Sequence, residues 1–252
     1  MRKGLLYDST LCIGCRACEQ ACAEKWGLPY SEKTSGEEKL SAHKLTTIVT
    51  FGEHYVRRLC MHCAVPTCAS VCPVGALQKT DLGPVIYDES RCMGCRYCML
   101  ACPYQVPTYE WDRRLPRVKK CDLCYARLRA GKPTACSEAC PTGATMTGDW
   151  DSLVREAQRR IAAKPFQYYP RIYGLHEAGG ASVLILSAVP FEQLGMKVNL
   201  PQEPLPLLTA RVLRFVPDVV SIGSVLLGGI YWITHRREEV AASEGKTHKD
   251  KE

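Results

Sequence analysis

The chain has 252 residues, enough for one or two compact domains, and its 16 cysteines all lie between Cys12 and Cys140. Its formal net charge is +7, but Lys and Arg are scattered along the sequence, whereas a nucleic-acid-binding surface needs them on one face. No nucleic-acid partner is therefore expected. The chain divides into a cysteine-rich region and a tail without cysteine.

The first predicted element is a short apolar strand, Gly4–Tyr7, which leads into YDSTLCIGCRACEQAC at residues 7–22. A second short strand, Pro84–Tyr87, leads into a near copy, YDESRCMGCRYCMLAC, at residues 87–102. In both copies two residues separate the first three cysteines, and three residues precede the fourth. The repetition indicates that one local unit was duplicated.

Two further cysteine groups complete the pattern. The second group of the chain reads C-x2-C-x4-C-x3-C and the last reads C-x2-C-x11-C-x3-C. Every group except the first ends in Cys-Pro. The polar stretch Leu28–Lys44, between the first two groups, is predicted to be a surface loop, either a solvated insertion or a docking surface for a larger subunit. In chain order the groups are Cys12, Cys15, Cys18, Cys22; Cys60, Cys63, Cys68, Cys72; Cys92, Cys95, Cys98, Cys102; and Cys121, Cys124, Cys136, Cys140.

This spacing predicts [4Fe–4S] clusters. Three cysteines separated by two residues each turn their thiols toward one point, and the helical turn after them carries the fourth thiol away. In the bacterial two-cluster arrangement the fourth cysteine binds the neighbouring cluster. The groups are therefore expected to work in pairs, and four complete groups predict four clusters.

Two other uses of cysteine fit the pattern less well. A scaffold held by disulfides would not repeat Cys-x-x-Cys, because cysteines three apart converge instead of bridging distant strands. Zinc sites take two ligands from each of two knuckles, so the third cysteine of each loop would be unneeded. Four clusters with their thiolates would add a charge of about −8, bringing the chain to about −1. Lys119 and Lys120 either form an ordinary solvated pair or partly neutralise the negative charge of a nearby cluster.

The second and third groups form a compact block, because the connector between them, QKTDLGPVIYDES, is short. We expect these two groups to share two clusters and the outer groups to pair around them, although pairing of the first group with the second and the third with the fourth also fits the sequence. The expected ligand sets are Cys12, Cys15, Cys18 with Cys140; Cys121, Cys124, Cys136 with Cys22; Cys60, Cys63, Cys68 with Cys102; and Cys92, Cys95, Cys98 with Cys72.

Three elements are predicted between the cysteines and the C-terminal apolar run. Asp149–Ala163 has apolar residues at fourfold spacing and predicts a surface helix with Asp149 as its cap. The apolar run Ser182–Val189 predicts an edge strand. The stretch Asn199–Leu207 has three prolines and predicts an extended spacer.

The run FVPDVVSIGSVLLGGIYWIT, residues 215–234, predicts a membrane anchor. A bilayer span needs about 20 mainly apolar residues, so Pro217 and Asp218 must lie in its first turn; the alternative is a helix buried in a partner's groove. Residues 235–252 contain five Lys and Arg and residues 197–214 contain three, which places the cysteine region on the outer, periplasmic side. Because MRKGLLYD offers no apolar signal core, export would rely on a partner that carries the signal.

The cysteine region resembles the four-cluster beta subunits of respiratory oxidoreductases. The resemblance covers about residues 3–148 and is carried by the order of the groups, the eleven-residue gap after Cys124, and the phrases CMHCAVPTCASVCPVGAL, DESRCMGCRYCMLACPY and CSEACPTGA. The tail, with GGASVLILSAVPFEQLG and one apolar helix, is similar to the beta subunits of membrane-bound formate dehydrogenases and quinone-reducing nickel–iron hydrogenases.

This resemblance implies the nested ligand sets and an α+β fold of tandem bacterial-ferredoxin-like modules followed by one transmembrane helix. It also implies a large molybdopterin or nickel–iron catalytic subunit on one side and a membrane quinone-reactive or cytochrome b subunit on the other. We expect an electron-transfer subunit with no catalytic site of its own, formate dehydrogenase being the first choice, followed by hydrogenase and then polysulfide and sulfoxide reductases. The expected domains are the cluster domain 1–148, the helix, strand and spacer 149–207, the anchor 208–236 and a charged tail 237–252.

Overall fold

The computed structural model describes residues 1–33, 35–37, 39–114 and 116–249, with side chains described up to residue 241. The chain forms two units, Met1–Pro206 and the segment from Leu207 onward. All 16 cysteines lie in the first unit. The residues 250–252 of the predicted tail lie outside the described residues.

A three-stranded sheet joins the N-terminus of the first unit to segments that follow the last cysteine. Strand β1 (Lys3–Asp8) lies in the middle, antiparallel to β8 (Thr145–Asp149) and parallel to β9 (Val183–Leu186). The alternating side chains of Leu5 and Leu6 are both fully buried, because the two faces of the sheet pack against different parts of the core. The residues after the cysteine region therefore complete its core.

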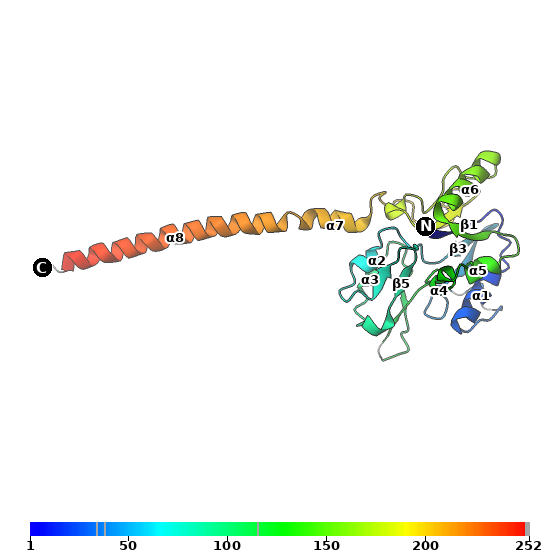
Figure 1. Cartoon of the computed structure of the whole chain (residues 1–252), viewed down its shortest axis with the longest axis horizontal. Coiled ribbons are helices and arrows are strands. Elements are labelled where there is room, and N and C mark those ends of the chain that lie inside the picture. Colours follow the sequence, from blue (N-terminus) through cyan, green and yellow to red (C-terminus); the bar gives the residue numbers. More distant parts are fainter. Residues whose placement is uncertain (34, 38, 115, 250–252) are drawn as a thin grey trace. The chain divides into compact units, whose positions relative to one another are not determined.

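Helix α6 (Trp150–Ala163) covers one face of this sheet (Figure 1). Its Leu153 and Ala157 are buried against Leu6, as the fourfold spacing predicts. The predicted cap is wrong in one respect: Asp149 stands at the N-cap position but makes no capping hydrogen bond. Its carboxylate instead accepts from Lys3 Nζ at 2.9 Å, across the β1–β8 pair.

Three antiparallel hairpins and several short helices frame the cysteine groups. The strand before the second motif copy is β5, one residue shorter than predicted. The hairpins are β2 (Thr47–Phe51) with β3 (His54–Arg58), β4 (Leu77–Lys79) with β5 (Val85–Tyr87), and β6 (Thr108–Tyr109) with β7 (Val118–Lys119). The helices are α1 (Ala17–Trp26), α2 (Thr67–Ser70), η1 (Glu89–Arg91), α3 (Tyr97–Ala101), α4 (Tyr125–Arg129) and α5 (Ala135–Glu138).

The segments outside these elements depart from the predictions in places. Strand β9 lies at the edge of the sheet, as predicted, but all of its residues are buried, and after it comes an irregular stretch instead of a strand up to Val189. A turn of 3-10 helix, η2 (Glu177–Gly179), precedes β9. The polar stretch from Leu28 is not simply solvated, because Ser35 and Lys44 are buried.

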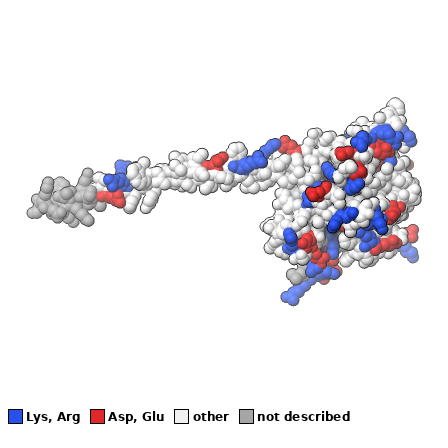
Figure 2. Space-filling model, in the orientation of Figure 1, with Lys and Arg blue, Asp and Glu red and all other residues white. Residues whose placement is uncertain are grey.

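The second unit is helical. Helix α7 (Leu205–Leu213) begins inside the predicted spacer, and α8 (Val216–Lys249) follows, with Pro217 and Asp218 in its first turn as predicted. Among the described residues, one helical segment, Leu205–Ala241, is long and apolar enough to cross a membrane, and its apolar window is not buried. Figure 2 shows a stretch of α8 without charged side chains, whereas basic and acidic residues are intermixed over the visible face of the first unit.

Candidate metal centres

The four cysteine groups share one local construction. In every group the third cysteine is the second residue of a short helix and is buried: Cys18 in α1, Cys68 in α2, Cys98 in α3 and Cys136 in α5. Each helix therefore begins one residue before the third cysteine. The fourth cysteine follows the end of the helix in the last three groups, whereas Cys22 lies within α1. All 16 cysteines carry free thiols.

The residue before the second cysteine has a positive φ in all four groups. It is glycine in the two motif copies, Gly14 (φ 71°) and Gly94 (φ 76°), but His62 (φ 50°) and Leu123 (φ 54°) in the other two. A left-handed residue turns the chain sharply, which keeps the first two thiols on the same concave side of the loop. The sequence indicated this turn only where it placed glycine, since histidine and leucine give no such signal.

The fourth cysteine of the first group lies beside the last group. Helix α1 packs against α5 (Figure 1). Burial raises the pKa of the Cys22 thiol to about 12, with further contributions from the charges of Cys136 and Cys124. Burial also raises the pKa of Cys121, and the charge of Cys22 adds to it. The structure thus brings Cys22 to the other three thiols of its expected set.

The fourth cysteines of the inner groups also lie near the neighbouring group. Helix α2 packs against α3. Burial raises the pKa of Cys63, and the charges of Cys60, Cys102 and Cys68 raise it further. These four thiols form one expected set. The other expected set lines a small cavity with Tyr109 and Val118: Cys72, Cys92, Cys95 and Cys98.

Cys140, the remaining fourth cysteine, lies in a different environment. Its partial burial would raise the thiol pKa, but hydrogen bonds from the backbone N–H groups of Thr145, Thr142 and Ala144 and from the Thr142 hydroxyl outweigh it, so the pKa is lowered. The described contacts of Cys140 do not include another cysteine, so its place beside Cys12, Cys15 and Cys18 remains a prediction.

The donor set fits iron–sulfur clusters. Buried thiols lose their protons only when a nearby cation stabilises the thiolate, and iron supplies that charge. Backbone N–H groups point at sulfur, from Ala76 to Cys72 at 3.2 Å and from Leu123 to Cys121 at 3.3 Å, and such bonds influence cluster potential. Within the described ranges, no three Cys, His, Asp or Glu side chains are close enough to hold a single metal ion.

Buried cations lie close to these thiols. Lys120 is buried and its Nζ donates to the carbonyls of Val85 and Cys121, and its charge lowers the pKa of Cys68, which burial raises overall. Lys119, by contrast, forms ion pairs with Glu89 and Glu110. Lys120 therefore lies near thiols of the cysteine groups, whereas Lys119 is ion-paired. The buried residues Glu19 and Arg57 were not predicted, because nothing in their sequence context distinguishes them from surface residues.

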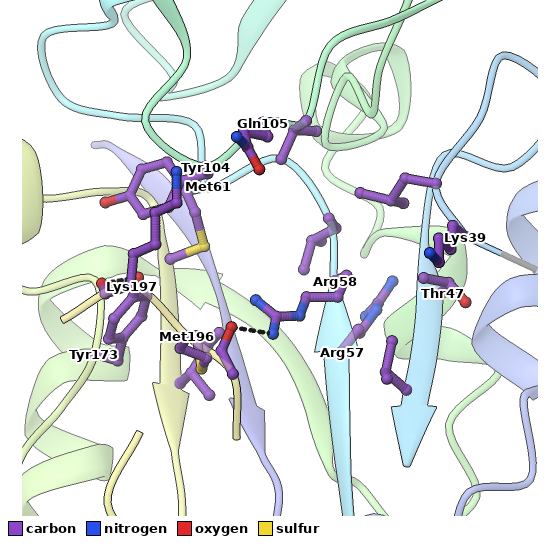
Figure 3. Close-up of a pocket in the computed structure, with 16 residues that line it drawn as sticks. Lys39, Thr47, Arg57, Arg58, Met61, Tyr104, Gln105, Tyr173, Met196 and Lys197 are labelled. Carbon is purple, nitrogen blue, oxygen red and sulfur yellow. Dashed lines mark hydrogen bonds between the residues drawn. The ribbon is translucent and has the colours of Figure 1, made fainter. Parts of the chain in front are cut away.

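A larger cavity of about 440 Å³ lies beside the hairpin β2–β3 (Figure 3). Its lining combines apolar and aromatic residues with polar ones, and its described lining residues include no cysteine; the polar and charged ones are Lys39, Thr47, Arg57, Arg58, Gln105 and Lys197. The Arg58 guanidinium donates to the carbonyls of Leu194 at 2.9 Å and Gly195 at 2.6 Å. Arg58 is therefore used to hold the loop that carries Gly195.

Sixteen free thiols in four like loops, brought together in pairs, define an iron–sulfur protein. Two models of a 4Fe–4S dicluster domain match the chain, over residues 11–76 and 52–150. Together with the relatives below, these matches show that the chain belongs to the family of 4Fe–4S dicluster proteins and is an iron–sulfur electron-transfer subunit.

Three relatives illustrate the family. A protein of Nitratidesulfovibrio vulgaris is 42% identical over 96% of this chain and 69% of its own length. The Hydrogenase-2 operon protein HybA of Escherichia coli O157:H7 is 39% identical over 77% of this chain and 72% of its own. The B subunit of the anaerobic dimethyl sulfoxide reductase of Haemophilus influenzae is 39% identical over 60% of this chain and 75% of its own. These names favour hydrogenase and sulfoxide reductase over the formate dehydrogenase that the sequence analysis preferred.

Proposed function

We propose that the chain carries four [4Fe–4S] clusters in a row and passes single electrons between a catalytic subunit and a membrane subunit. The observation that carries this proposal is that four loops of one construction, each with its third cysteine buried at the start of a short helix, lie in one unit and pack in two pairs through α1 with α5 and α2 with α3. The clusters supply one-electron redox chemistry, while the chain supplies ligands, spacing and the electrostatic environment.

The nested ligand sets given above are part of this proposal. The proximity of Cys22 to Cys136 and Cys124, and of Cys102 to Cys63, supports the exchange of fourth cysteines between groups. The cavity lined by Cys72 with the third group supports it as well. Pairing of the first group with the second has no such contact in its favour among the described residues.

The thiols also indicate an order for the relay. Three contacts link successive sets: the charge of Cys136 acts on Cys18, that of Cys60 acts on Cys121, and that of Cys98 acts on Cys68. These interactions favour one order of the four ligand sets. Named by the first cysteine of each, the order is Cys12, Cys121, Cys60 and Cys92. A relay through successive short steps would follow this order.

A hydrogenase of the HybA kind is our first candidate for the catalytic partner. The HybA match covers 77% of this chain, so it extends beyond the cysteine region, whereas the sulfoxide reductase matches cover 60–64%. A molybdopterin reductase, or a formate dehydrogenase, is the second candidate. The identity of the large subunit that co-purifies with the chain decides between them.

The C-terminal helix is proposed to anchor the subunit in the membrane beside a quinone-reactive or cytochrome b subunit. Its apolar side chains are exposed, and Arg236 and Arg237 follow the apolar run. An Asp at mid-bilayer costs about 2.5–3.5 kcal/mol, so the placement of Asp218 in the first turn suits a span. The excess of Lys and Arg after the helix favours the cluster region on the outer face.

Metal content tests the proposal as a whole. Anaerobically purified protein should be brown and contain about sixteen iron and sixteen labile sulfide per chain, since each cluster has four of each. Half that iron, with zinc making up the rest, would contradict it.

The variant Cys22→Ser tests the ligand sets. It should perturb the cluster held by Cys121, Cys124 and Cys136 and leave that of Cys12, Cys15 and Cys18 intact. The matched variant Cys102→Ser should perturb the cluster of Cys60, Cys63 and Cys68. Electron paramagnetic resonance of the reduced variants distinguishes the sites. Loss of the cluster in the substituted cysteine's own group would show that each loop closes its own cluster.

Truncation after Pro206 tests the anchor, because the first unit ends there. The shortened protein should keep its clusters and accept electrons from the catalytic subunit in a dye assay, but should no longer sediment with membranes or support quinone reduction. Continued membrane attachment after carbonate washing would contradict the anchor.

A further inference from the structure

Arg57 is a buried cation near thiols of the first and last cysteine groups. It lies on β3, is 2% exposed, and projects from the opposite side of the strand to Arg58. Its Nε donates to the Thr46 hydroxyl at 3.0 Å and one Nη donates to the Thr145 hydroxyl at 3.3 Å. Both acceptors are neutral, so they orient the guanidinium without balancing its charge.

The negative groups beside Arg57 are cysteine sulfurs. Its charge interacts with Cys136, Cys18 and Cys121, and it hydrogen-bonds to Cys136. Within the described part of the chain it forms no ion pair with Asp or Glu. A buried charge without a counterion is strongly destabilising. With clusters bound, its counterions would be the thiolates of two different expected ligand sets, those of Cys18 and of Cys136.

We propose that Arg57 is a positioning residue that raises the reduction potential of both clusters in the pair formed by the first and last cysteine groups. This inference rests on the proposed function, because it needs clusters at those thiols. Each cluster takes up one electron without a bond being made or broken, so its negative charge increases by one. A fixed positive charge in a buried, low-dielectric site stabilises that added charge. Because it lies near ligands of both sets, it acts on both.

The other cluster pair has different cations, which makes the effect separable. Lys79 donates to the backbone carbonyl of Cys63 in the second group, and the charge of Lys120 acts on Cys68 of the same group. Lys120 also donates to the carbonyl of Cys121 in the last group, so it lies between the two pairs. Removal of Arg57 should therefore change the reduction potentials of the clusters in the first and last groups and leave those of the second and third groups unchanged.

The test is a redox titration of the anaerobic full-length protein, followed by electron paramagnetic resonance. Arg57→Gln removes the charge, and Thr46→Asp neutralises it in place by putting a carboxylate where Nε now meets a hydroxyl. We expect both to lower the equilibrium constant for reduction of the two clusters about tenfold, a shift of about 59 mV to lower potential for a one-electron couple. Arg57→Lys keeps the charge and should shift the potentials by less than half as much.

Arg58→Gln is the matched control, because Arg58 neighbours Arg57 but donates to the carbonyls of Leu194 and Gly195. Its potentials should equal those of the unaltered protein. If the Arg57→Gln protein does not assemble its clusters, the reduction potentials of the Thr46→Asp protein test the inference instead. Fully loaded Arg57→Gln or Thr46→Asp with unchanged potentials, or an equal shift in all four clusters, would overturn the inference. An unaltered protein without four clusters, judged by iron and sulfide content, would instead contradict the proposed function.

Discussion

The two motif copies, residues 7–22 and 87–102, have nearly the same sequence and backbone but very different surroundings. Both place glycine at φ 71° or 76°, and both place arginine at φ 58° or 65° immediately before the helix that holds the third cysteine. Around the first copy, however, the chain is folded back on the loop. Around the second, the loop lies largely open to solvent.

The difference is clearest at residues that occupy the same position in each copy. Glu19 is 2% exposed, whereas its counterpart Met99 is 37% exposed. Arg16 donates to the carbonyls of Ser35 and Ile48, whereas Arg96 lies over the Trp111 ring, 4.6 Å from its centroid. The same loop conformation is therefore held by a buried ionic network in the first copy and by a stacking contact at the surface in the second copy.

Substitution of the buried carboxylate should have the largest effect. Glu19 accepts from the Ile48 N–H at 2.5 Å and pairs with Lys44 at 2.7 Å and Arg16 at 3.1 Å. Glu19→Gln leaves the buried Lys44 and the half-buried Arg16 without this carboxylate, which should cost about 3–5 kcal/mol. The midpoint of thermal unfolding, followed by cluster absorbance, should fall by about 6–20 °C at roughly 2–4 °C per kcal/mol.

Met99→Gln is the control for that substitution. Because Met99 is partly exposed, the change should alter the free energy of unfolding by no more than about 0.5 kcal/mol. Equal losses in the two variants would show that the ionic network around the first copy contributes little.

Alanine substitution of the two motif glycines should also affect the two copies differently, with a smaller difference in the free energy of unfolding. Both residues have positive φ, which costs an L-residue about 1–2 kcal/mol. At Gly14 the new Cβ would also overlap the Tyr55 ring, whereas at Gly94 its nearest neighbour is the Pro116 carbonyl at 3.6 Å. Gly14→Ala should therefore destabilise the protein by about 1–3 kcal/mol more than Gly94→Ala. Rates of cluster loss to an iron chelator should rank the variants in the same order; the reverse ranking would contradict this interpretation.

Apart from the Met99 control, the smallest effect is expected at the stacked arginine. Arg96→Gln removes the cation above Trp111, which should cost about 0.5–1 kcal/mol because the site is solvent-exposed. Thermal unfolding should shift down by about 1–4 °C. The equivalent Arg16→Gln removes an ion pair and two carbonyl hydrogen bonds and should shift it several times further. Similar shifts at the two arginines would mean that the first loop is less dependent on its surroundings than its contacts indicate.

The features that were predicted correctly are those decided by neighbours in sequence. Cysteine spacing indicated the loops and the helical turn after each third cysteine, and apolar spacing indicated α6 and the strands at Gly4 and Pro84. Loop geometry depends on a few adjacent dihedral angles, and helix amphipathicity on residues three and four apart, so short patterns suffice.

Tertiary structure decided what depends on residues far apart in the chain. Asp149 matched a helix cap, but pairing of β1 with β8 brought Lys3 to its carboxylate. Arg57 and Glu19 look like surface residues in sequence, and only the folding of the hairpin β2–β3 and the stretch before it onto the first loop buries them. Charge burial is set by the whole surrounding volume, which no local pattern encodes. The sequence alone thus determined the kind of centre this protein builds, whereas the tertiary contacts decided which charges lie around each one.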